Sequence, residues 1–191
     1  DFYKIYKPAK PLLWWYIRKQ HKNADINLVT SETIKEELNV EGIERLSVIP
    51  RGVDAENRHP KFKDAAMRER LTNGEPGNKL LVFIGRLAVE KEIHKLLPML
   101  EKRSDISLAI IGDGPARNDL EKVFEGTRTV FTGFLHGEEL SKAYASSDAF
   151  IFPSISETLG LVILEGMASG LPIIAAKSGP TMEQVSHEVN G

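Results

Sequence analysis

The sequence lacks several features that would point to particular classes of protein. It contains no cysteine, which excludes disulfides, thiolate metal sites and a cysteine nucleophile. No apolar run approaches the ~20 residues that a membrane-spanning helix needs. The formal net charge is −2, without the basic surplus that nucleic-acid binding favours, so we expect no nucleic-acid partner. The 191 residues suit one domain, or one domain with part of another.

Two common nucleotide-binding motifs are also missing. Gly112-Asp113-Gly114 begins like the dinucleotide fingerprint G-x-G-x-x-G, but Arg117 stands where the third glycine belongs. No stretch matches the phosphate-binding loop G-x-x-x-x-G-K-[ST]. Chemistry based on NAD or on a P-loop is therefore disfavoured. The sequence has no D-x-D and no cluster of histidines and carboxylates at metal-ligand spacing, so we predict no protein-held metal.

From residue 79 onward, short apolar segments alternate with amphipathic ones. Strands are expected over 79–84, 107–111, 129–132, 149–152 and 171–176. Each is followed by a predicted helix, over 90–102, 115–125, 137–146, 160–169 and 180–187. Continuous apolar strands that alternate with helices indicate a parallel sheet covered on both faces. The predicted fold class is therefore α/β, a Rossmann-like doubly wound parallel sheet.

The first part of the chain is less regular. It reads as a helix over 8–23, a strand over 25–30, a helix over 32–38, a strand over 45–49, a polar connector over 51–64 and a helix over 65–71. Ser31 is expected to cap the second of these helices. The chain starts at Asp1 and ends on the turn signal Asn190-Gly191, so we expect an internal segment of a longer protein.

Basic residues follow the first strand of the predicted sheet, and ligands of open parallel sheets bind at the carboxyl ends of strands. Gly85 and Arg86 come directly after this strand, and Lys91 follows five residues after Arg86. The two cations could hold a diphosphate between them. The alternative is a surface pair that forms salt bridges with Glu90 and Glu92. Spacing alone favours the surface alternative, because basic residues after strands are common.

One glutamate lies within the predicted helix over 160–169, and another precedes it. Glu165 lies inside this largely apolar helix, where an unpartnered carboxylate is costly. A vicinal diol such as a ribose would satisfy it, and so would an internal lysine or arginine; the residues leave both open. Glu157 precedes the helix and either stabilises its start or holds a polar ligand near the first N–H groups.

Five motifs together resemble a known family. They are R-G-V-D (51–54), G-R-L-x-x-E-K (85–91), G-D-G-P (112–115), G-F-L-x-x-x-E-L (133–140) and P-S-x-S-E-T-L-G-x-V-x-L-E-x-M-A-S-G-x-P (153–172). The combination resembles the family-four retaining glycosyltransferases, whose GT-B fold has two facing Rossmann-like domains. Within that family the motifs look most similar to the sulfoquinovosyltransferases, which move sulfoquinovose from UDP to diacylglycerol. The resemblance covers about residues 25 to 191.

This resemblance implies a role for each matching residue. Arg86 and Lys91 match the basic pair on the donor diphosphate, Glu165 matches the ribose ligand, and Glu157 matches the residue that contacts the donor sugar. The other implied donor-binding residues act mainly through the backbone and are Gly85, Phe134, Leu135, Leu159, Gly160 and Leu161. The sequence departs from the family pattern close to Arg86 and Lys91, where Glu92 replaces the usual glycine or asparagine. Two other departures, Ser178-Gly179-Pro180-Thr181 and Ile155, lie in loops on the donor side.

The resemblance also predicts the organisation and partners of the chain. Residues 1–49 would be the end of the acceptor-side domain, 50–78 a hinge and lead-in, and 79–191 an incomplete donor-binding domain. The expected substrates are a UDP-sugar, UDP-sulfoquinovose in particular, and a lipid such as diacylglycerol, without a prosthetic group or metal. Other hypotheses are a glucosyl- or mannosyltransferase, a nucleotide-sugar-binding segment without catalysis, and a module without a ligand.

A membrane contact is a further expectation. The apolar run from Leu12 to Ile17 precedes Arg18, Lys19 and Lys22, a pattern that suits a helix at the surface of an anionic membrane. The alternative, which the run of six apolar residues favours, is that this helix packs against the rest of the acceptor domain. The expected location is peripheral, on the cytoplasmic side of a membrane, and on a plastid membrane if the source is a photosynthetic eukaryote.

Overall fold

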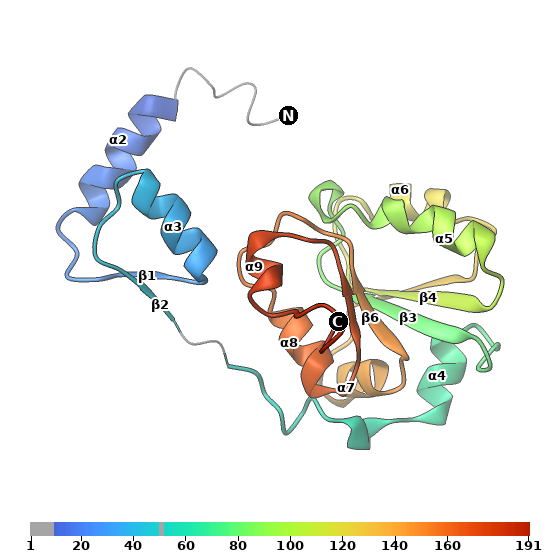
Figure 1. Ribbon diagram of the computed structural model, residues 1–191. Coiled ribbons are helices and arrows are strands. Elements are labelled where there is room, and N and C mark those ends of the chain that lie inside the picture. Colours follow the sequence, from blue (N-terminus) through green and yellow to red (C-terminus); the bar gives the residue numbers. More distant parts are fainter. Residues whose placement is uncertain (1–9, 50–51) are drawn as a thin grey trace. The chain divides into compact units, whose positions relative to one another are not determined.

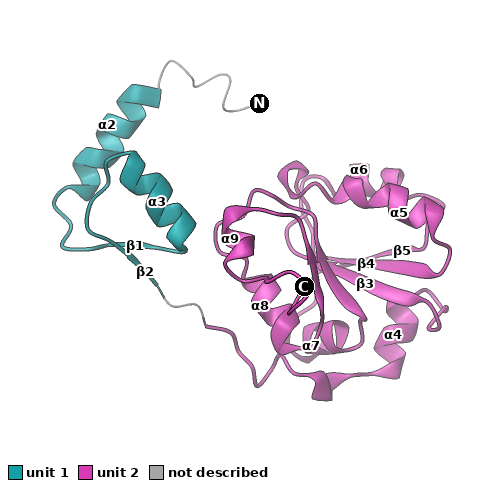
Figure 2. Ribbon diagram, viewed as in Figure 1, with its two compact units in different colours: residues 1–51 teal, residues 52–191 magenta. Residues whose placement is uncertain are grey.

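A computed structural model describes residues 10–49 and 52–191. The first two residues of the predicted helix over 8–23 and Arg51 of the R-G-V-D motif lie outside them. The chain forms two compact units, Asp1–Arg51 and Gly52–Gly191, which are coloured separately in Figure 2. This boundary lies close to the predicted end of the first domain at residue 49, while the identity of the two parts as acceptor and donor domains stays a prediction.

The first unit is a small α/β arrangement. Its elements are α2 (Lys10–His21), β1 (Asn27–Val29), α3 (Glu32–Val40) and β2 (Leu46–Val48), and the two strands pair in parallel. The Ser31 hydroxyl accepts a hydrogen bond from the Ile34 N–H at 3.2 Å, which confirms the predicted cap of α3. The apolar run of α2 is largely exposed within the described unit, with Leu12, Leu13, Trp15 and Tyr16 all more than half accessible. No helix among the described residues is both long enough and apolar enough to cross a membrane.

The second unit contains a parallel sheet of five strands. These are β3 (Lys79–Ile84), β4 (Ile106–Ile111), β5 (Thr129–Gly133), β6 (Ala149–Phe152) and β7 (Ile173–Ala175), in the order β5-β4-β3-β6-β7. The chain moves outward from β3 to β5, then returns to the other side of β3 with β6. The predicted α/β fold class is therefore confirmed, and the direction of strand addition reverses beside β3.

Helices cover both faces of this sheet. They are α4 (Ala65–Leu71), α5 (Leu97–Lys102), α6 (Arg117–Val123), α7 (Gly137–Ala145), α8 (Leu161–Ala168) and α9 (Gly179–Met182). Figure 1 shows α5 and α6 on one side of β3 and β4, with α4 and α7 on the other. The core between these layers includes three stacked, fully buried aromatic rings: Phe83 lies 6.3 Å from Phe152, which lies 6.1 Å from Phe150. Burial of this stack of rings stabilises the sheet.

The amino-terminal edge of the sheet is held by an arginine–aspartate pair. Arg68 of α4 donates two hydrogen bonds to Asp148, at 2.8 and 3.3 Å, and others to the carbonyl oxygens of Asn78 and Ser146. Asp148 also accepts the Leu80 N–H at 2.8 Å. Burial by itself raises the pKa of the Asp148 carboxyl, but the hydrogen bonds from Arg68 and Leu80 outweigh it and lower the pKa below its ordinary value. The starts of β3 and β6 are thereby tied to α4.

The structure corrects the helix predicted over 90–102. Two short 3-10 turns, η3 (Val89–Lys91) and η4 (Ile93–Leu96), come first, and only 97–102 form an α-helix. Glu92 between the turns has φ 53°, a left-handed conformation that ends a right-handed helix. Lys91 therefore lies in a tight turn against the sheet and not at the start of a long helix.

The last predicted helix, over 180–187, is also shorter than expected. It ends at Met182, and the chain then turns, with the Ser186 N–H bonded to the Asn190 side chain at 2.7 Å and Glu188 at φ 58°. This side-chain acceptor takes the Ser186 N–H out of the helical pattern, so the helix does not continue to residue 187.

Glu92 provides a direct test of this local geometry. Replacing it with glycine is expected to raise the free energy of unfolding by about 0.5–1 kcal/mol, because glycine adopts a positive φ without steric cost. The change also removes a buried carboxylate oxygen that has no hydrogen-bond partner in the described structure. The substitution also removes the ion pair with Lys95 (2.7 Å). Lys95→Ala removes the same pair and measures its contribution to the free energy of unfolding. Urea unfolding of the variants checks the prediction, and a Glu92→Gly protein less stable than Lys95→Ala would contradict it.

Candidate functional site

A cavity of about 510 Å³ opens at the carboxyl ends of β3 and β6. This is the point where strand order reverses, the usual ligand-binding position in open α/β sheets. Its lining residues are Phe83, Ile84, Gly85, Arg86, Glu90, Lys91, Phe152, Ser156, Glu157, Leu159, Gly160, Leu161 and Val162. Seven of the predicted site residues are thus brought together: Gly85, Arg86, Lys91, Glu157, Leu159, Gly160 and Leu161.

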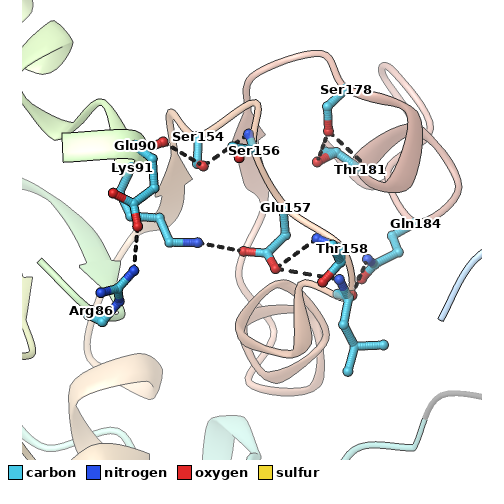
Figure 3. A network of polar contacts seen from close by, with 11 residues as sticks. Arg86, Glu90, Lys91, Ser154, Ser156, Glu157, Thr158, Ser178, Thr181 and Gln184 are labelled. Carbon is cyan, nitrogen blue, oxygen red and sulfur yellow. Dashed lines mark hydrogen bonds and ion pairs between the residues drawn. The ribbon is translucent and has the colours of Figure 1, made fainter. Parts of the chain in front are cut away.

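A salt bridge, drawn in Figure 3, joins Lys91 and Glu157, which both line this cavity. The Lys91 Nζ donates to Glu157 Oε2 at 2.8 Å, and both side chains are less than a fifth exposed. The ammonium group also lies 5.7 Å from the centre of the Phe152 ring, a cation–π distance. The lysine is therefore held in place from two sides, pointing into the cavity from the turn after β3.

Glu157 is fixed as firmly as its partner. Its second oxygen accepts the backbone N–H groups of Thr158 (3.0 Å) and Leu159 (3.4 Å). Burial raises the pKa of the Glu157 carboxyl, but the hydrogen bonds from Lys91 and these N–H groups lower it below its ordinary value overall. The residue is consequently ionised at neutral pH and orders the loop that leads to α8.

Arg86 is more loosely held. Its side chain is 63% exposed, and its guanidinium forms an ion pair with Glu90 in the next turn. The surface pair with Glu90, one of the two alternatives from the sequence, is therefore present for Arg86, whereas Lys91 pairs across the cavity. The Glu90 carbonyl oxygen accepts a hydrogen bond from Ser154 at 3.3 Å, which ties the turn after β3 to the loop after β6 (Figure 3). Because the Arg86 side chain is largely exposed, it has room to turn toward an anion in the cavity.

The start of α8 presents backbone N–H groups to the same cavity. Gly160 precedes the helix at φ 61°, a conformation that favours glycine. Gln184 donates to the Leu159 carbonyl oxygen at 2.9 Å and fixes the loop from the other side. The first N–H groups of a helix have no partner within it and attract anions, so this helix start and Lys91 are suited to the same phosphate group.

Glu165 lies one helical turn beyond the cavity and has internal partners. Its Oε1 is 3.3 Å from the Nε of Arg58, and its Oε2 accepts the Tyr144 hydroxyl at 2.9 Å. The internal arginine that the sequence left open is therefore present. Because the charge is paired, we expect its removal to lower the melting temperature. A carboxylate offers about four acceptor positions, so the pair leaves room for a further ligand.

The loop after β5 lies outside the set of residues that line the cavity. Leu135 is buried, and Phe134 is 64% exposed, with its ring centre 6.0 Å from that of His136. This loop follows the edge strand of the sheet, two strands from β3. Phe134 and Leu135 are therefore not grouped with Arg86 and Lys91 in this cavity. Their predicted contact with a base stays a prediction.

Sequence reasoning missed Arg58, Tyr144 and Gln184. Each acts through a contact between residues far apart in the chain, and each sits in a stretch whose pattern is ordinary for a connector or a helix. The one sequence feature that could have drawn attention to Arg58 was the R-G-V-D motif, which ends a few residues earlier at Asp54. Within the ranges 10–49 and 52–191, no group of three histidine, aspartate or glutamate side chains is placed to hold a metal ion.

Comparison with known proteins decides the family. The sequence profile described as Glycosyl transferases group 1 matches residues 67–191, which is more than half of the chain. The chain belongs to this family. A second profile, described as Glycosyltransferase Family 4, matches residues 2–57.

Individual relatives agree with the family. The glycosyltransferase is 45% identical over 186 residues to a sulfoquinovosyl transferase of Arabidopsis thaliana, and the match covers 96% of this chain and 36% of the relative. It is 36% identical to a GDP-mannose-dependent alpha-mannosyltransferase of Corynebacterium glutamicum, covering 96% of this chain and 44% of the relative. The chain thus spans less than half the length of these relatives.

A solved structure shows the same fold. Anabaena HepE, crystallised in complex with UDP-glucose, matches with a TM-score of 0.77 and 25% identity, covering 90% of this chain and 50% of that one. The GT-B architecture expected from the motifs is therefore supported by structural similarity as well as by sequence.

Proposed function

We propose that this chain supplies the donor site of a retaining glycosyltransferase that transfers sulfoquinovose from UDP-sulfoquinovose to a lipid acceptor such as diacylglycerol. The 45% identity to a sulfoquinovosyl transferase along 96% of the chain carries the choice of sugar. UDP-glucose in the similar HepE structure supports UDP as the nucleotide. The chain covers little more than a third of the sulfoquinovosyl transferase, so the activity is proposed for the full-length protein.

The geometry of the cavity suits departure of a diphosphate. In the transfer, the bond between the anomeric carbon and a diphosphate oxygen breaks, and its electron pair leaves with UDP. The acceptor hydroxyl forms the new bond on the same face and passes its proton to the departing diphosphate oxygen, which also guides its approach. Lys91, Arg86 and the start of α8 stabilise the negative charge that grows on the diphosphate, which lowers the barrier. Glu157 contacts the donor sugar and keeps Lys91 aimed at the phosphates.

A panel of donors tests the proposal. We expect calorimetric titration of the 191-residue chain to show binding of UDP in preference to GDP and ADP. With the full-length protein, transfer from UDP-sulfoquinovose to diacylglycerol should exceed transfer from UDP-glucose. UDP binding by the chain without turnover in the full-length protein would instead support a nucleotide-sugar-binding protein, and no nucleotide binding would support a module without this ligand.

Mannosyl transfer from GDP-mannose is the second candidate. Alpha-mannosyltransferases of Corynebacterium glutamicum and Mycolicibacterium smegmatis are 36% and 38% identical over more than nine-tenths of this chain. A preference for GDP over UDP in the same titration, with turnover of GDP-mannose, would establish this candidate in place of the first.

Substitution of Glu165 by glutamine is expected to reduce both UDP affinity and stability. If Glu165 binds the ribose hydroxyls, weakening two charge-assisted hydrogen bonds lowers UDP affinity at least about tenfold. The melting temperature should also fall, since Arg58 then lies in a mostly buried position without its counter-charge. Glu139→Gln, which disrupts the exposed pair with Arg70, is the matched control and should change neither quantity much. A lower melting temperature with unchanged UDP affinity would make Glu165 purely structural.

The proposal includes a peripheral membrane contact through α2. Residues 1–49 would be part of the acceptor-side domain. The protein would lie on the cytoplasmic side of a membrane, or on a plastid membrane. The exposed Trp15 ring lies 5.3 Å from the Lys19 ammonium, an arrangement suited to the boundary between lipid head groups and tails. A lipid acceptor would make such docking useful.

Flotation with anionic liposomes tests this contact. The full-length protein should float with the vesicles, and a Trp14→Ala/Trp15→Ala variant should bind several-fold less, because the aromatic anchors are lost. A Val40→Ala variant, at an exposed apolar position outside α2, is the control. Equal flotation of the double variant and the wild type would show that α2 serves another purpose, such as packing against the remainder of the acceptor domain.

A further inference from the structure

The Glu165 carboxylate is held between two elements that precede α8 in the chain. The Tyr144 hydroxyl from α7 donates to Oε2 at 2.9 Å, and the Arg58 Nε lies 3.3 Å from Oε1. Tyr144 is fully buried, and burial together with the negative charge of Glu165 raises the pKa of its hydroxyl well above the ordinary value. The tyrosine therefore stays protonated and acts as a permanent donor to the carboxylate.

Arg58 is itself fixed by several contacts. Its Nη1 donates to the Ser141 hydroxyl at 3.0 Å and to the Asn57 carbonyl oxygen at 3.3 Å. Its guanidinium carbon lies 5.7 Å from the centre of the Tyr144 ring, and only 13% of the side chain is exposed. The connector that carries it is tied to the end of α7, where the Ser146 hydroxyl bonds both the N–H and the carbonyl oxygen of Asp64. The arginine thus has little freedom to move.

The contact between Arg58 and Glu165 is unusual in its geometry. Within the described part of the chain, the Arg58 Nε–H is buried and has no hydrogen-bond partner, although the two charges are only 3.3 Å apart. The arginine attracts Oε1 by its charge without a well-aligned hydrogen bond, so the lone pairs of that oxygen stay available. Glu165 remains 26% exposed on the turn of α8 next to Val162, which lines the cavity.

We infer that Arg58 is a positioning residue: it sets the orientation of the Glu165 carboxylate so that its free lone pairs accept the ribose hydroxyls of the nucleotide. This inference rests on the proposed function. Arg58 itself makes no contact with the nucleotide, and its effect on binding passes entirely through Glu165. A merely structural ion pair would stabilise the fold and leave recognition of the ribose unchanged.

Comparison of UDP with 2′-deoxy-UDP separates the two roles, because the analogue lacks one hydroxyl that Glu165 binds. Calorimetric titration should show that the wild type binds UDP about tenfold more tightly than 2′-deoxy-UDP, the effect of one charge-assisted hydrogen bond. In Arg58→Met, which keeps the packing over Tyr144, this ratio should fall below about threefold. The affinity for 2′-deoxy-UDP, which keeps the 3′-hydroxyl, should fall less than the affinity for UDP. Arg58→Lys restores the charge and should recover part of the ratio.

Two further variants keep the test decisive. Tyr144→Phe removes only the hydroxyl that holds Oε2 and should lower the ratio as well, so the inference remains testable if Arg58→Met does not fold. Arg70→Met disrupts an exposed arginine–glutamate pair away from the cavity and should leave the ratio at the wild-type value. A wild-type ratio retained in both Arg58→Met and Tyr144→Phe would overturn the inference while the proposed function stands. Failure of the wild type to bind UDP would instead refute the proposed function.

Discussion

Replacing Lys91 with alanine is expected to lower kcat/KM of the full-length protein in the proposed transfer by about a hundredfold to a thousandfold, the effect of removing one donor aimed at a developing negative charge. Lys91 is the better-fixed cation of the cavity, held at 2.8 Å by Glu157 and resting over Phe152. Its position therefore costs no reorganisation when charge moves onto the diphosphate. Arg86→Ala should have a smaller effect, since the Arg86 side chain is largely exposed and paired with Glu90.

Lys95→Ala is the matched control for this prediction. Lys95 lies one turn further along the same segment, is exposed, and pairs with Glu92 outside the set of cavity-lining residues. Steady-state kinetics with the proposed donor should show near-wild-type turnover for this control. If Lys91→Ala retained wild-type kcat/KM, Lys91 would be a structural partner of Glu157 and the diphosphate would have to be stabilised elsewhere.

The second large effect is expected at Gly112, in the loop after β4. An added Cβ atom would lie 2.0 Å from the Gly85 carbonyl oxygen, and the residue has φ 134°, which favours glycine. Gly112→Ala should therefore cost about 3 kcal/mol or more of unfolding free energy, from overpacking and from backbone strain together. For a chain of this size, that corresponds to a fall in melting temperature of roughly 6–12 °C. Because Gly85 precedes Arg86, UDP affinity should fall as well.

Gly126→Ala isolates the backbone contribution. Gly126 also has a positive φ, 77°, but its Cβ would meet no atom within 4 Å. Its substitution should cost only about 1 kcal/mol, the strain of a left-handed conformation. Equal losses of stability in the two variants, measured by thermal unfolding, would show that the loop after β4 can move away from Gly85 and that the close approach does not matter.

The sequence predicts the sheet well because its signal is local. The central strands of the second unit are short, largely apolar runs that become buried, whereas the edge strand β5, which contains two threonines, is half-buried. The helix predicted over 90–102 fails for the opposite reason. Its apolar spacing is compatible with a helix, but Glu92 adopts a left-handed conformation that spacing does not register. The only hint lay in the family resemblance, where glycine or asparagine is usual at this position.

For the candidate site, the sequence predicts where the residues lie but not which partners they contact. The rule that ligands bind at the carboxyl ends of strands assigns Arg86, Lys91 and Glu157 to one edge of the sheet from the sequence alone. The identity of their partners does not follow from this rule. Glu165 shows this clearly: its apolar helix indicates that a partner is needed, but Arg58 lies in an irregular connector, and only the folded chain brings the two together.

The Arg68–Asp148 pair at the amino-terminal edge of the sheet has a consequence for how this scaffold can be altered. It ties β3, β6 and α4 together at the end of the strands remote from the cavity. Mutant libraries directed at the loop over 154–160 can therefore explore new donor sugars while Arg68 and Asp148 are left in place to carry the fold. An enzyme engineer would diversify the loops at the carboxyl ends of the strands and keep the residues at the amino-terminal ends constant. Loss of folding and change of specificity would then not be confounded.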